Sequence, residues 1–435
     1  MTNRRCFIDF MLCFLLAGLS GAFATNSLIA AERPNIVLIF ADDLGWQETG
    51  FTGSDYCETP NLDRLAGQGM VFRNAYASAS NCQPSRACML SGQYTARHGV
   101  YAVGSTKRGP DALMRMIPIP NRGNLPLATV TMGESLKAAG YATGFFGKCH
   151  MKDSDKGKSE HAGFDAVKVS QHGLNSKDPA DPKAIFSITE AACEFIEANR
   201  QGPFFAYLPH YAVHSALQGR AKTLAHFKEK PKGQLGHGDP LFGACLADLD
   251  TGVGMVLDKL KALGLDDNTL VVFTSDNGGT HVLQEPLRGK KGCYYEGGIR
   301  VPMIVRWPGK VARDSITHQV GHIIDFMPTL LELAESKYPR EFNGHKILPV
   351  EGKSLLPVFR GQKRDGHESL NWELFGNRAI RQGDWKLVWG ASEKTWELYD
   401  LKTDRSETNN LAGNFPERVT AMSRDWQAWQ ERIEN

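Results

Sequence analysis

The segment CQPSR, residues 82–86, places a cysteine and an arginine one helical turn apart, directly before an apolar stretch that Ser91-Gly92 closes. That apolar stretch, residues 87–90, is predicted to be helical. A nucleophile at the start of a helix meets the positive end of the helix dipole, which favours an anionic substrate or transition state. Arg86, one turn after Cys82, can reach the same anion. A cysteine near an arginine is more often structural than catalytic, so the pair alone leaves both interpretations open.

Acidic and amide side chains follow two predicted strands. Asp42-Asp43 comes directly after the apolar run of residues 35–40, and Asp276-Asn277 follows the run of residues 270–274. Three carboxylates and one amide are hard oxygen donors, which suit Ca²⁺ or Mg²⁺ and not zinc. The structural alternative is that Asp42-Asp43 caps a helix and that Asp276-Asn277-Gly278 forms a turn.

Basic and imidazole side chains follow two further strands, predicted over residues 141–146 and 203–208. In open α/β sheets, ligands bind beyond the carboxyl ends of the strands. The fold class alone therefore predicts that one edge of the sheet gathers Asp42, Asp43, Lys148, His150, His214, Asp276 and Asn277.

The elements that must position these residues alternate along the chain. Continuous apolar, β-branched runs such as residues 35–40 are expected for strands buried on both faces of a parallel sheet. Thr59-Pro60 is typical of a helix start, Thr131 with Glu134 forms a capping box, and residues 240–263 form a long amphipathic pattern. We predict an α/β fold with a large mixed, mostly parallel sheet sandwiched by helices.

The texture of the chain changes after about residue 340. Residues 378–389 and 396–401 are typical of short antiparallel strands, and residues 416–433 of a final helix. We therefore predict a catalytic domain over residues 32–340 and a smaller C-terminal α+β subdomain with a short antiparallel sheet over residues 341–435.

The composition of the 435 residues is that of a soluble globular chain, with 42% hydrophobic and 23% charged residues. Lys and Arg number 50 against 48 Asp and Glu, for a formal charge of +2. This balance does not indicate a basic surface of the kind that binds nucleic acid or an anionic membrane.

The N-terminus has the parts of a secretory signal peptide over residues 1–31. Arg4-Arg5 precedes an apolar run over residues 10–24, and small residues at Ala22-Phe23-Ala24 and Ala30-Ala31 offer cleavage sites. The run is shorter than the roughly 20 residues of a spanning helix. We expect a periplasmic or secreted protein with no membrane contact after cleavage.

Seven cysteines follow residue 31, at positions 57, 82, 88, 149, 193, 245 and 293. None forms a C-x-x-C pair, so zinc-ribbon and thioredoxin classes lack support. An odd number in an exported chain leaves one thiol for chemistry, and Cys82 is the candidate. The other six are expected either to form disulfides or to lie as small buried hydrophobes.

Several segments together resemble the motifs of the sulfatase family, the formylglycine-dependent members of the alkaline-phosphatase-like superfamily. CQPSRACMLSG is similar to the family's C-x-P-S-R with its following T/S-G. IFADDLGW and FTSDNGG resemble the metal motifs, GKCH resembles G-K-W-H, and HYAVHSALQ resembles the histidine segment. LRGKKGCYYEGGIRVP places Lys291 before a match to Y-E-G-G-x-R-x-P, and residues 378–387 and 397–401 resemble the C-terminal segment.

The resemblance implies an exported sulfuric ester hydrolase, with a sulfated small molecule or carbohydrate as substrate. It implies that a formylglycine-generating enzyme or an equivalent maturase oxidises Cys82 to formylglycine. One Ca²⁺ is expected, with the oxygen derived from Cys82 among its ligands and the others supplied by Asp42, Asp43, Asp276 and Asn277.

Each remaining site residue has an expected role within that resemblance. Arg86, Lys148 and Lys291 should stabilise the negative charge that spreads over a sulfate ester in its transition state. His214, assisted by Lys291, should protonate the leaving alcohol, and His150 should accept a proton from the hydrated aldehyde. One hydroxyl of that aldehyde should attack sulfur and expel the alcohol, and the second should then release sulfate.

The sequence departs from the family pattern at two positions. Cys149 replaces the usual Trp between Lys148 and His150, and Lys290 replaces the second Gly of R-G-G-K, so that either lysine could enter the site. The register favours Lys291. His281 and Gln284 are candidates for substrate contact, as are residues 170–172, and His210 stays open. A structural role is expected for His98, His161, His318 and His345.

Two other functions compete with the sulfatase hypothesis. The same superfamily site can serve phosphorus, as in a phosphodiesterase or phosphonate monoester hydrolase. Alternatively, the chain is a catalytically silent binding protein in which Cys82 stays a thiol. The particular substrate, exo or endo action and the oligomeric state stay open.

Overall fold

The computed structural model describes residues 33–105, 120–151, 154, 157–170, 175–234, 238–280, 284–374, 376–390 and 394–434. The predicted signal peptide, His281 and residues 171–172 lie outside these ranges. The described residues from 33 onward form one compact unit. The predicted division at residue 340 stays a prediction.

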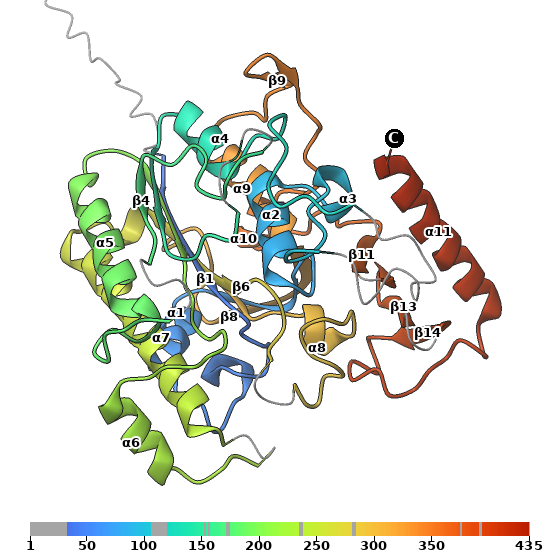
Figure 1. Ribbon diagram of the computed structural model, residues 1–435, viewed down its shortest axis with the longest axis horizontal. Coiled ribbons are helices and arrows are strands. Elements are labelled where there is room, and N and C mark those ends of the chain that lie inside the picture. Colours follow the sequence, from blue (N-terminus) through green and yellow to red (C-terminus); the bar gives the residue numbers. More distant parts are fainter. Residues whose placement is uncertain are drawn as a thin grey trace, which may run out of the picture. The chain divides into compact units, whose positions relative to one another are not determined.

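Eight strands form the large sheet, in the order β4-β3-β5-β1-β6-β7-β2-β8 (Figure 1). β1 pairs in parallel with β5 and β6, whereas β7 runs antiparallel to β6 and β2. The mixed, mostly parallel sheet of the prediction is confirmed. Its strands are β1 (Asn35–Ala41), β2 (Met70–Tyr76), β3 (Ala142–Phe146), β4 (Ala166–Lys168), β5 (Phe204–Pro209), β6 (Thr269–Ser275), β7 (Met303–Arg306) and β8 (Ser315–His322).

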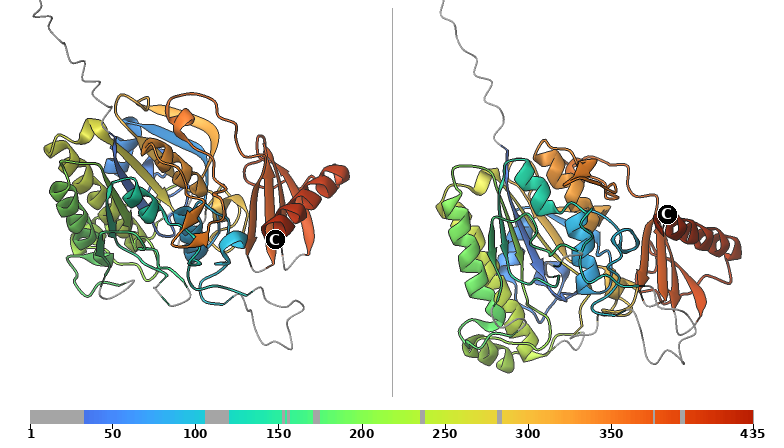
Figure 2. Two further views of the ribbon diagram at one scale, coloured as in Figure 1. Left: turned by 90° about the horizontal axis from the view of Figure 1, so that it is seen from above. Right: turned by 45° about the horizontal axis from the view of Figure 1, so that its top comes forward.

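Helices cover both faces of this sheet because side chains alternate along each strand. Val37 and Ile39 of β1 join the core under α5 and α7, and Leu38 and Phe40 join the core under α2, α4 and α9 (Figure 2). The helices are α1 (Pro60–Gly67), α2 (Cys82–Ser91), α3 (Thr95–His98), α4 (Met132–Ala138), α5 (Ile185–Ala198), α6 (Ala221–Glu229), α7 (Pro240–Ala262), α8 (Glu296–Ile299), α9 (Phe326–Leu333), α10 (Leu356–Phe359) and α11 (Pro416–Glu434).

The 23-residue α7 is long and apolar enough to cross a membrane by length and composition. However, 72% of its most apolar window is buried inside the protein, where it packs on α5, α6 and α1. Its apolar character is therefore that of a core helix in a globular fold.

A second, antiparallel sheet lies near the C-terminus, as predicted. Its order is β11 (Leu370–Leu374), β12 (Asn377–Gln382), β13 (Trp385–Gly390) and β14 (Thr395–Asp400). α11 packs on one face through Trp426, and the other face packs on Tyr76 and Ile299 of the larger part. A two-stranded ribbon, β9 (Glu341–Phe342) with β10 (His345–Lys346), precedes it.

The helix signals in the sequence had different outcomes. The Thr131–Glu134 capping box forms at the start of α4. Thr59 precedes α1 but its side chain does not cap the helix, because its hydroxyl accepts a hydrogen bond from the Gly50 N–H and donates to Asp63. The helix predicted over residues 87–90 begins earlier, at Cys82 itself.

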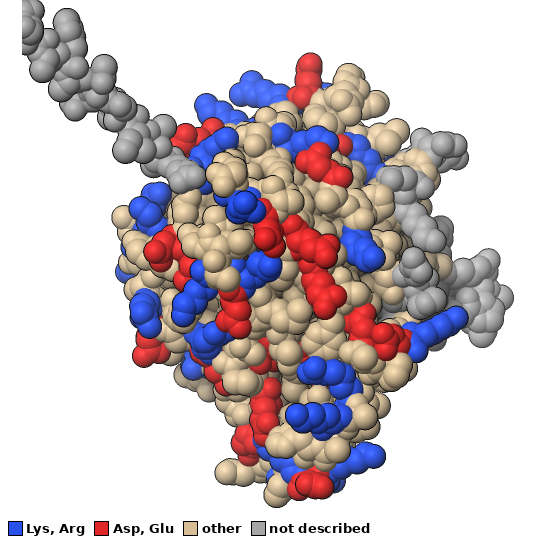
Figure 3. All heavy atoms as spheres, turned by 90° about the vertical axis from the view of Figure 1, so that its left-hand side faces the viewer, with Lys and Arg blue, Asp and Glu red and all other residues tan. Residues whose placement is uncertain are grey.

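The seven cysteines after residue 31 are all free thiols, and five of them are buried. Of the six other than Cys82, Cys57, Cys88, Cys193 and Cys245 lie as small buried hydrophobes, whereas Cys149 and Cys293 are only partly buried. On the face that carries α5 and α7, acidic and basic side chains are interspersed (Figure 3). This mixture agrees with the small net charge.

Candidate active site

The floor of the site forms where β1 and β6 end side by side. Ala41 is paired in register with Ser275, so Asp42 and Asp276 leave the sheet at the same edge. The backbone N–H of Asp43 donates to Asp276 Oδ1 at 3.0 Å. The Asn277 amide donates to Asp43 Oδ1 at 2.8 Å, which ties the two strand ends together.

Helix α2 brings Cys82 to this edge. Asn81 precedes the helix in an extended conformation, and its side-chain oxygen accepts a hydrogen bond from the Cys82 N–H at 2.9 Å. The Cys82 thiol and one carboxylate oxygen from each of Asp42 and Asp276 lie within 4.8 Å of one another. The predicted nucleophile and two predicted metal ligands are therefore brought together.

Arg86, one turn into α2, is completely buried against the same carboxylates. Its Nε donates to Asp276 Oδ2 at 2.9 Å. Its Nη1 and Nη2 have no hydrogen-bond partner among the described residues. A buried guanidinium with two unused donor atoms beside a thiol can bind an anion at that place.

Two lysine ammonium groups complete the positive side of the site. Lys148 Nζ lies 2.5 Å from Asp42 Oδ2, and Lys291 Nζ lies 2.6 Å from Asp43 Oδ1 and 3.8 Å from the Cys82 sulfur. Lys290 is exposed, so Lys291 is the lysine that enters the site.

The pKa values of these groups reflect burial and their neighbours. Burial works to raise the pKa of Asp42, but the charges of Lys148 and Arg86, with a contribution from His214, together outweigh it and hold this pKa below its ordinary value. For Asp276, burial and the adjacent Asp42 charge both raise the pKa above the ordinary value. Burial raises the pKa of the Cys82 thiol to about 11, so an unmodified Cys82 is a neutral thiol at pH 7.

The arrangement of oxygens fits a hard divalent cation. Asp42 Oδ1 and Asn277 Oδ1 are buried and accept no hydrogen bond from the described residues. Buried acceptors without donors cost stability unless a cation or water satisfies them. The donor set of carboxylate and amide oxygens is the one that Ca²⁺ and Mg²⁺ prefer.

The two predicted histidines lie in different surroundings. The His214 ring is partly exposed, with Nε2 3.7 Å from Asp43 Oδ2 and Nδ1 2.6 Å from the Ser215 carbonyl oxygen. Since that oxygen only accepts, Nδ1 carries a proton. Burial, followed by the charges of Lys148 and Arg86, lowers the pKa of His150 to about 2, so this ring is neutral.

Sequence reasoning missed the residue that holds His150 in place. Glu160 is buried, and its Oε1 accepts hydrogen bonds from the backbone N–H groups of His150 and Met151. Glu160 belongs to none of the recognised motifs. The signal available in the sequence was a carboxylate within about ten residues of the loop that follows a predicted strand.

The other open candidates are less closely tied to the site. His210 is buried, which lowers its pKa to about 4, and its backbone N–H donates to the Phe40 carbonyl oxygen of β1. Gln284 is buried and donates to Glu48 at 2.6 Å.

Known proteins resemble this chain over most of its length. Residues 34–336 match the family described as Sulfatase, and residues 289–427 match the one described as N-sulphoglucosamine sulphohydrolase, C-terminal. A Sulfatase of Formosa agariphila is 34% identical over 92% of this chain and 89% of the relative. Human Arylsulfatase A is 31% identical over 91% and 87%, respectively.

A solved structure gives the same picture. The crystal structure of Ps i-CgsB in complex with k-i-k-neocarrahexaose superimposes with a TM-score of 0.77 at 28% identity, and the match covers 92% of this chain and 93% of that one.

Proposed function

Because this chain belongs to the sulfatase family and is a sulfuric ester hydrolase, we propose that it cleaves a sulfate monoester of a carbohydrate at Cys82. The observation that carries the proposal is the convergence of one thiol, three carboxylates and three cationic side chains at the ends of β1, β6 and α2. The sugar preference is supported by Ps i-CgsB, whose structure holds k-i-k-neocarrahexaose.

A bound Ca²⁺, held by Asp42, Asp43, Asp276, Asn277 and the oxygen at position 82, would polarise the sulfate and favour ionisation of the attacking hydroxyl. The two buried acceptor oxygens without donors, on Asp42 and Asn277, support this assignment. The cations around Asp42 hold its pKa below the ordinary value, so this carboxylate is ionised and ready to act as a ligand.

Oxidation of Cys82 by a maturase would give the aldehyde of formylglycine, and addition of one water to this aldehyde would supply two geminal hydroxyls, one for attack and one for sulfate release. The raised pKa of the thiol supports this requirement, since an unmodified Cys82 is a weak nucleophile at neutral pH. The predicted signal peptide would carry the chain to the periplasm or out of the cell.

The cationic side chains bind and orient the sulfate. Arg86 keeps two Nη atoms without a hydrogen-bond acceptor among the described residues, with Nη2 3.8 Å from Asp42 Oδ1, and Lys291 lies beside the Cys82 sulfur. Fixed cations in a buried site stabilise the charge that spreads over the sulfate oxygens in the transition state. Because they are already positioned by Asp42, Asp43 and Asp276, they need no rearrangement during the reaction.

The two histidines divide the proton transfers. The protonated form of His214 carries a proton on Nε2, and its partly exposed position lets it reach the leaving alcohol. His150 is neutral, so it accepts a proton from the hydroxyl at position 82 when sulfate is released. Glu160 holds the backbone of His150 during this step.

Peptide mass spectrometry of the exported protein tests the modification directly. Formylglycine at position 82 replaces one sulfur by oxygen and removes two hydrogens. Cys82→Ala should abolish hydrolysis of an aryl sulfate without loss of the folded state, whereas Cys193→Ala, at a buried thiol away from the site, should retain it. An unmodified Cys82 in an active protein would contradict the proposal.

Substrate class and metal are tested in the same assay. Matched aryl sulfate and aryl phosphate esters should show a large preference for sulfate. A chelator should inactivate the protein, and added Ca²⁺ should restore it. A preference for the phosphate ester would instead support the phosphodiesterase alternative.

A further inference from the structure

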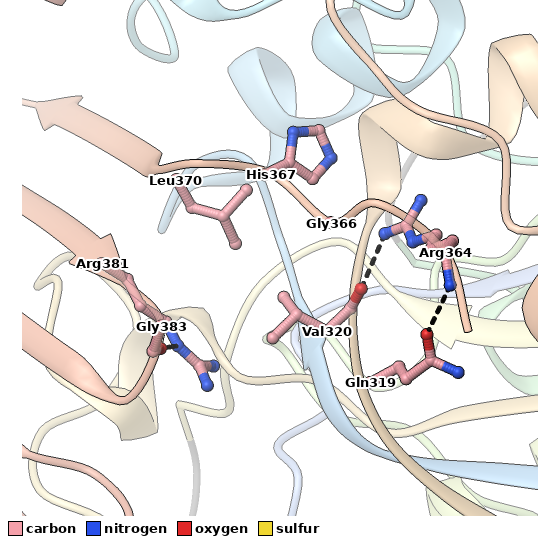
Figure 4. A pocket seen from close by; sticks show the side chains of 8 residues that line it. All are labelled: Gln319, Val320, Arg364, Gly366, His367, Leu370, Arg381 and Gly383. Atoms are coloured by element: carbon pink, nitrogen blue, oxygen red, sulfur yellow. Dashed lines mark hydrogen bonds between the residues drawn. The ribbon is translucent and has the colours of Figure 1, made fainter.

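A hollow of about 170 Å³ lies between the edge strand β8 and the C-terminal antiparallel sheet (Figure 4). Gln319 and Val320 of β8, residues 364–370, and Arg381 with Gly383 at the end of β12 line it. Strands β7 and β2 separate β8 from β6. None of the residues that line the hollow is one of the residues gathered around Cys82.

Arg381 brings to this hollow a positive charge that no direct ion pair neutralises among the described residues, although the buried Glu296 carboxylate attracts it at longer range. Its side chain is only 5% exposed, and its Nε donates to the Gly383 carbonyl oxygen at 2.9 Å. Its Nη1 is buried and has no acceptor among the described residues. The guanidinium lies 4.9 Å from the Tyr76 ring, and within the described chain no carboxylate lies within ion-pair distance of it.

Arg364 faces the hollow from the opposite wall. Its side chain is 4% exposed, and its Nη2 donates to the Val320 carbonyl oxygen and to Asp325 Oδ2. Its Nε is buried without an acceptor in the described part of the chain. Asp325 is already engaged, because His367 Nε2 lies 2.6 Å from its other oxygen. The local carboxylate therefore cannot also neutralise Arg381.

We propose that this hollow binds a small oxyanion between Arg381 and Arg364. Two buried guanidinium groups that each keep an unsatisfied donor are costly unless a ligand accepts from them. Planar guanidinium donors match the oxygens of sulfate, phosphate and carboxylate groups. A water takes up about 30 Å³, so the hollow has room for such an anion with a few waters. The apolar side chains of Val320 and Leu370 strengthen the attraction by excluding water.

The bound anion would connect three segments that are far apart in sequence. β8 belongs to the large sheet, β12 to the C-terminal sheet, and residues 364–370 link the two. A ligand that binds only the folded state stabilises it. The proposed anion therefore fastens the C-terminal sheet to the edge of the large sheet, independently of ester hydrolysis.

Site-resolved binding is the first test. Crystals of the full chain soaked in selenate should show an anomalous peak between Arg364 and Arg381, and crystals of Arg381→Gln should lack that peak. Selenate is also expected near Cys82, and this second peak should persist in the variant. A peak at the Cys82 site alone, or no peak at all, would overturn the proposal.

Calorimetric titration at constant ionic strength gives the affinity and the kind of anion. Sulfate, phosphate and acetate are titrated separately into the Lys148→Ala chain, which weakens binding at the Cys82 site. Adding Arg381→Gln should weaken the remaining affinity about ten- to a hundredfold, as expected for a lost charged hydrogen bond. Tight binding of acetate indicates a carboxylate ligand, and preference for the other two indicates a tetrahedral one. No binding of any of the three contradicts the proposal.

A matched pair of variants at Gly366 tests the same site independently of whether the Arg381→Gln variant folds. A Cβ at Gly366 meets no atom within 4 Å, so side chains are accommodated there. Gly366→Asp adds a negative charge at the wall and should weaken anion binding at least about tenfold. Gly366→Asn has the same shape without the charge and should bind nearly as the unmodified chain does. Equal affinities for the two variants would count against an anion site, and both should retain esterase activity.

Discussion

The proposed mechanism needs a proton donor for the leaving alcohol, and His214 lies at the partly open side of the site, where that alcohol would depart. Its Nδ1–H is fixed on the Ser215 carbonyl oxygen, and its Nε2 faces Asp43 and the partly open side of the site. His150 is instead enclosed and neutral. At the scale of single residues, the two histidines therefore differ in exposure and hydrogen bonding, which supports the different roles that we propose for them.

His214→Gln should lower kcat on a sugar or alkyl sulfate by about 10²–10⁴-fold, because the departing alkoxide then lacks a proton donor. The loss should be much smaller with nitrophenyl sulfate, whose leaving group is stable without a proton. Steady-state rates on both esters measure the difference. His226→Gln, at an exposed histidine paired with Glu58, is the control and should change neither rate. Equal losses on both esters would argue against general-acid catalysis by His214.

Most of the site residues were predictable from one sequence because each follows a buried strand or begins a helix. The choice of Lys291 over Lys290 needed only register, and the structure agrees with it. Glu160 was not predictable, since its contact to the His150 backbone depends on how a loop returns to the sheet. Arg86 shows an intermediate case: its place was predicted, but not its complete burial against Asp276.

At the scale of elements, the start of α2 decides where residue 82 lies. Asn81 accepts the Cys82 N–H and so fixes the first turn of the helix. Helix-capping side chains contribute roughly 1 kcal/mol. The same kind of cap occurs at α4, where Thr131 and Glu134 form a capping box outside the site.

Asn81→Ala should lower the free energy of unfolding by about 1 kcal/mol and also lower kcat, because the helix start that positions residue 82 loosens. Thr131→Ala removes a comparable cap and should cost a similar stability with unchanged kcat. Urea unfolding and steady-state kinetics on both variants make the comparison. If both variants lose kcat in the same proportion, the effect is one of stability alone.

The loop after β3 depends on the ionisation of Glu160. Burial raises the pKa of Glu160 from about 4.5 to about 7. The folded state therefore holds a proton that the unfolded chain releases above pH 4.5. The stability contributed by this proton is complete below about pH 4.5 and is lost as pH rises through about 7.

Glu160→Gln should flatten this dependence, because the amide oxygen still accepts from the His150 and Met151 N–H groups but does not titrate. The expected difference in unfolding free energy between the two proteins should change by about 3 kcal/mol from pH 4.5 to pH 8, in favour of the variant at the higher pH. Urea denaturation at several pH values measures it. A constant difference across this range would mean that Glu160 titrates normally.

Element prediction succeeded for continuous apolar runs and failed for mixed ones. β1 and β6 are wholly buried and were recognised from their β-branched residues. β2, β4, β7 and β8 were not predicted: MVFRNAY and SITHQVGH carry polar side chains within the strand, and β4 and β7 are only three and four residues long. Those polar residues find partners in tertiary contacts, as Asn74 does by donating to the His318 carbonyl oxygen across the β2–β8 pair.

At the scale of the whole described chain, a buried ionic cluster joins the two sheets. Lys386 of β13 lies 2.8 Å from Glu296 of α8 and 2.8 Å from Glu407, and all three side chains are inaccessible to solvent. Burial opposes ionisation of Glu296, but Lys386, Arg300 and Arg381 together outweigh it and lower the pKa of Glu296 to about 2. The Tyr76 hydroxyl donates to the same carboxylate at 2.8 Å.

Lys386→Met should destabilise the protein by about 3–5 kcal/mol, because it leaves the buried Glu407 without its cation and Glu296 with only the more distant Arg300, at 3.9 Å. Thermal or urea unfolding measures the loss. Lys259→Met, which breaks an exposed pair with Glu197, is the control and should have little effect. A triple variant that also carries Glu296→Gln and Glu407→Gln should recover part of the stability, and failure to do so would assign the loss to packing.

The fold class and the meeting of strand ends were predictable for the whole chain, since parallel α/β sheets impose them. The attachment of the C-terminal sheet was not, because it depends on contacts such as Lys386 with Glu296 between residues far apart in sequence. The hydrophobic pattern of each strand carries no information about which distant loop will cover it.

Cys82 is only 2% exposed in the folded protein, and this burial limits the time during which the residue can be modified. Asp276 and Lys291, which close over the thiol, are synthesised long after residue 82 has left the ribosome. The proposed maturase would therefore reach this sulfur only before the chain folds. Where the chain folds before Cys82 is oxidised, we expect two populations of native protein, one with formylglycine at position 82 and one with an inert thiol. Treatment of the folded protein should not convert one into the other.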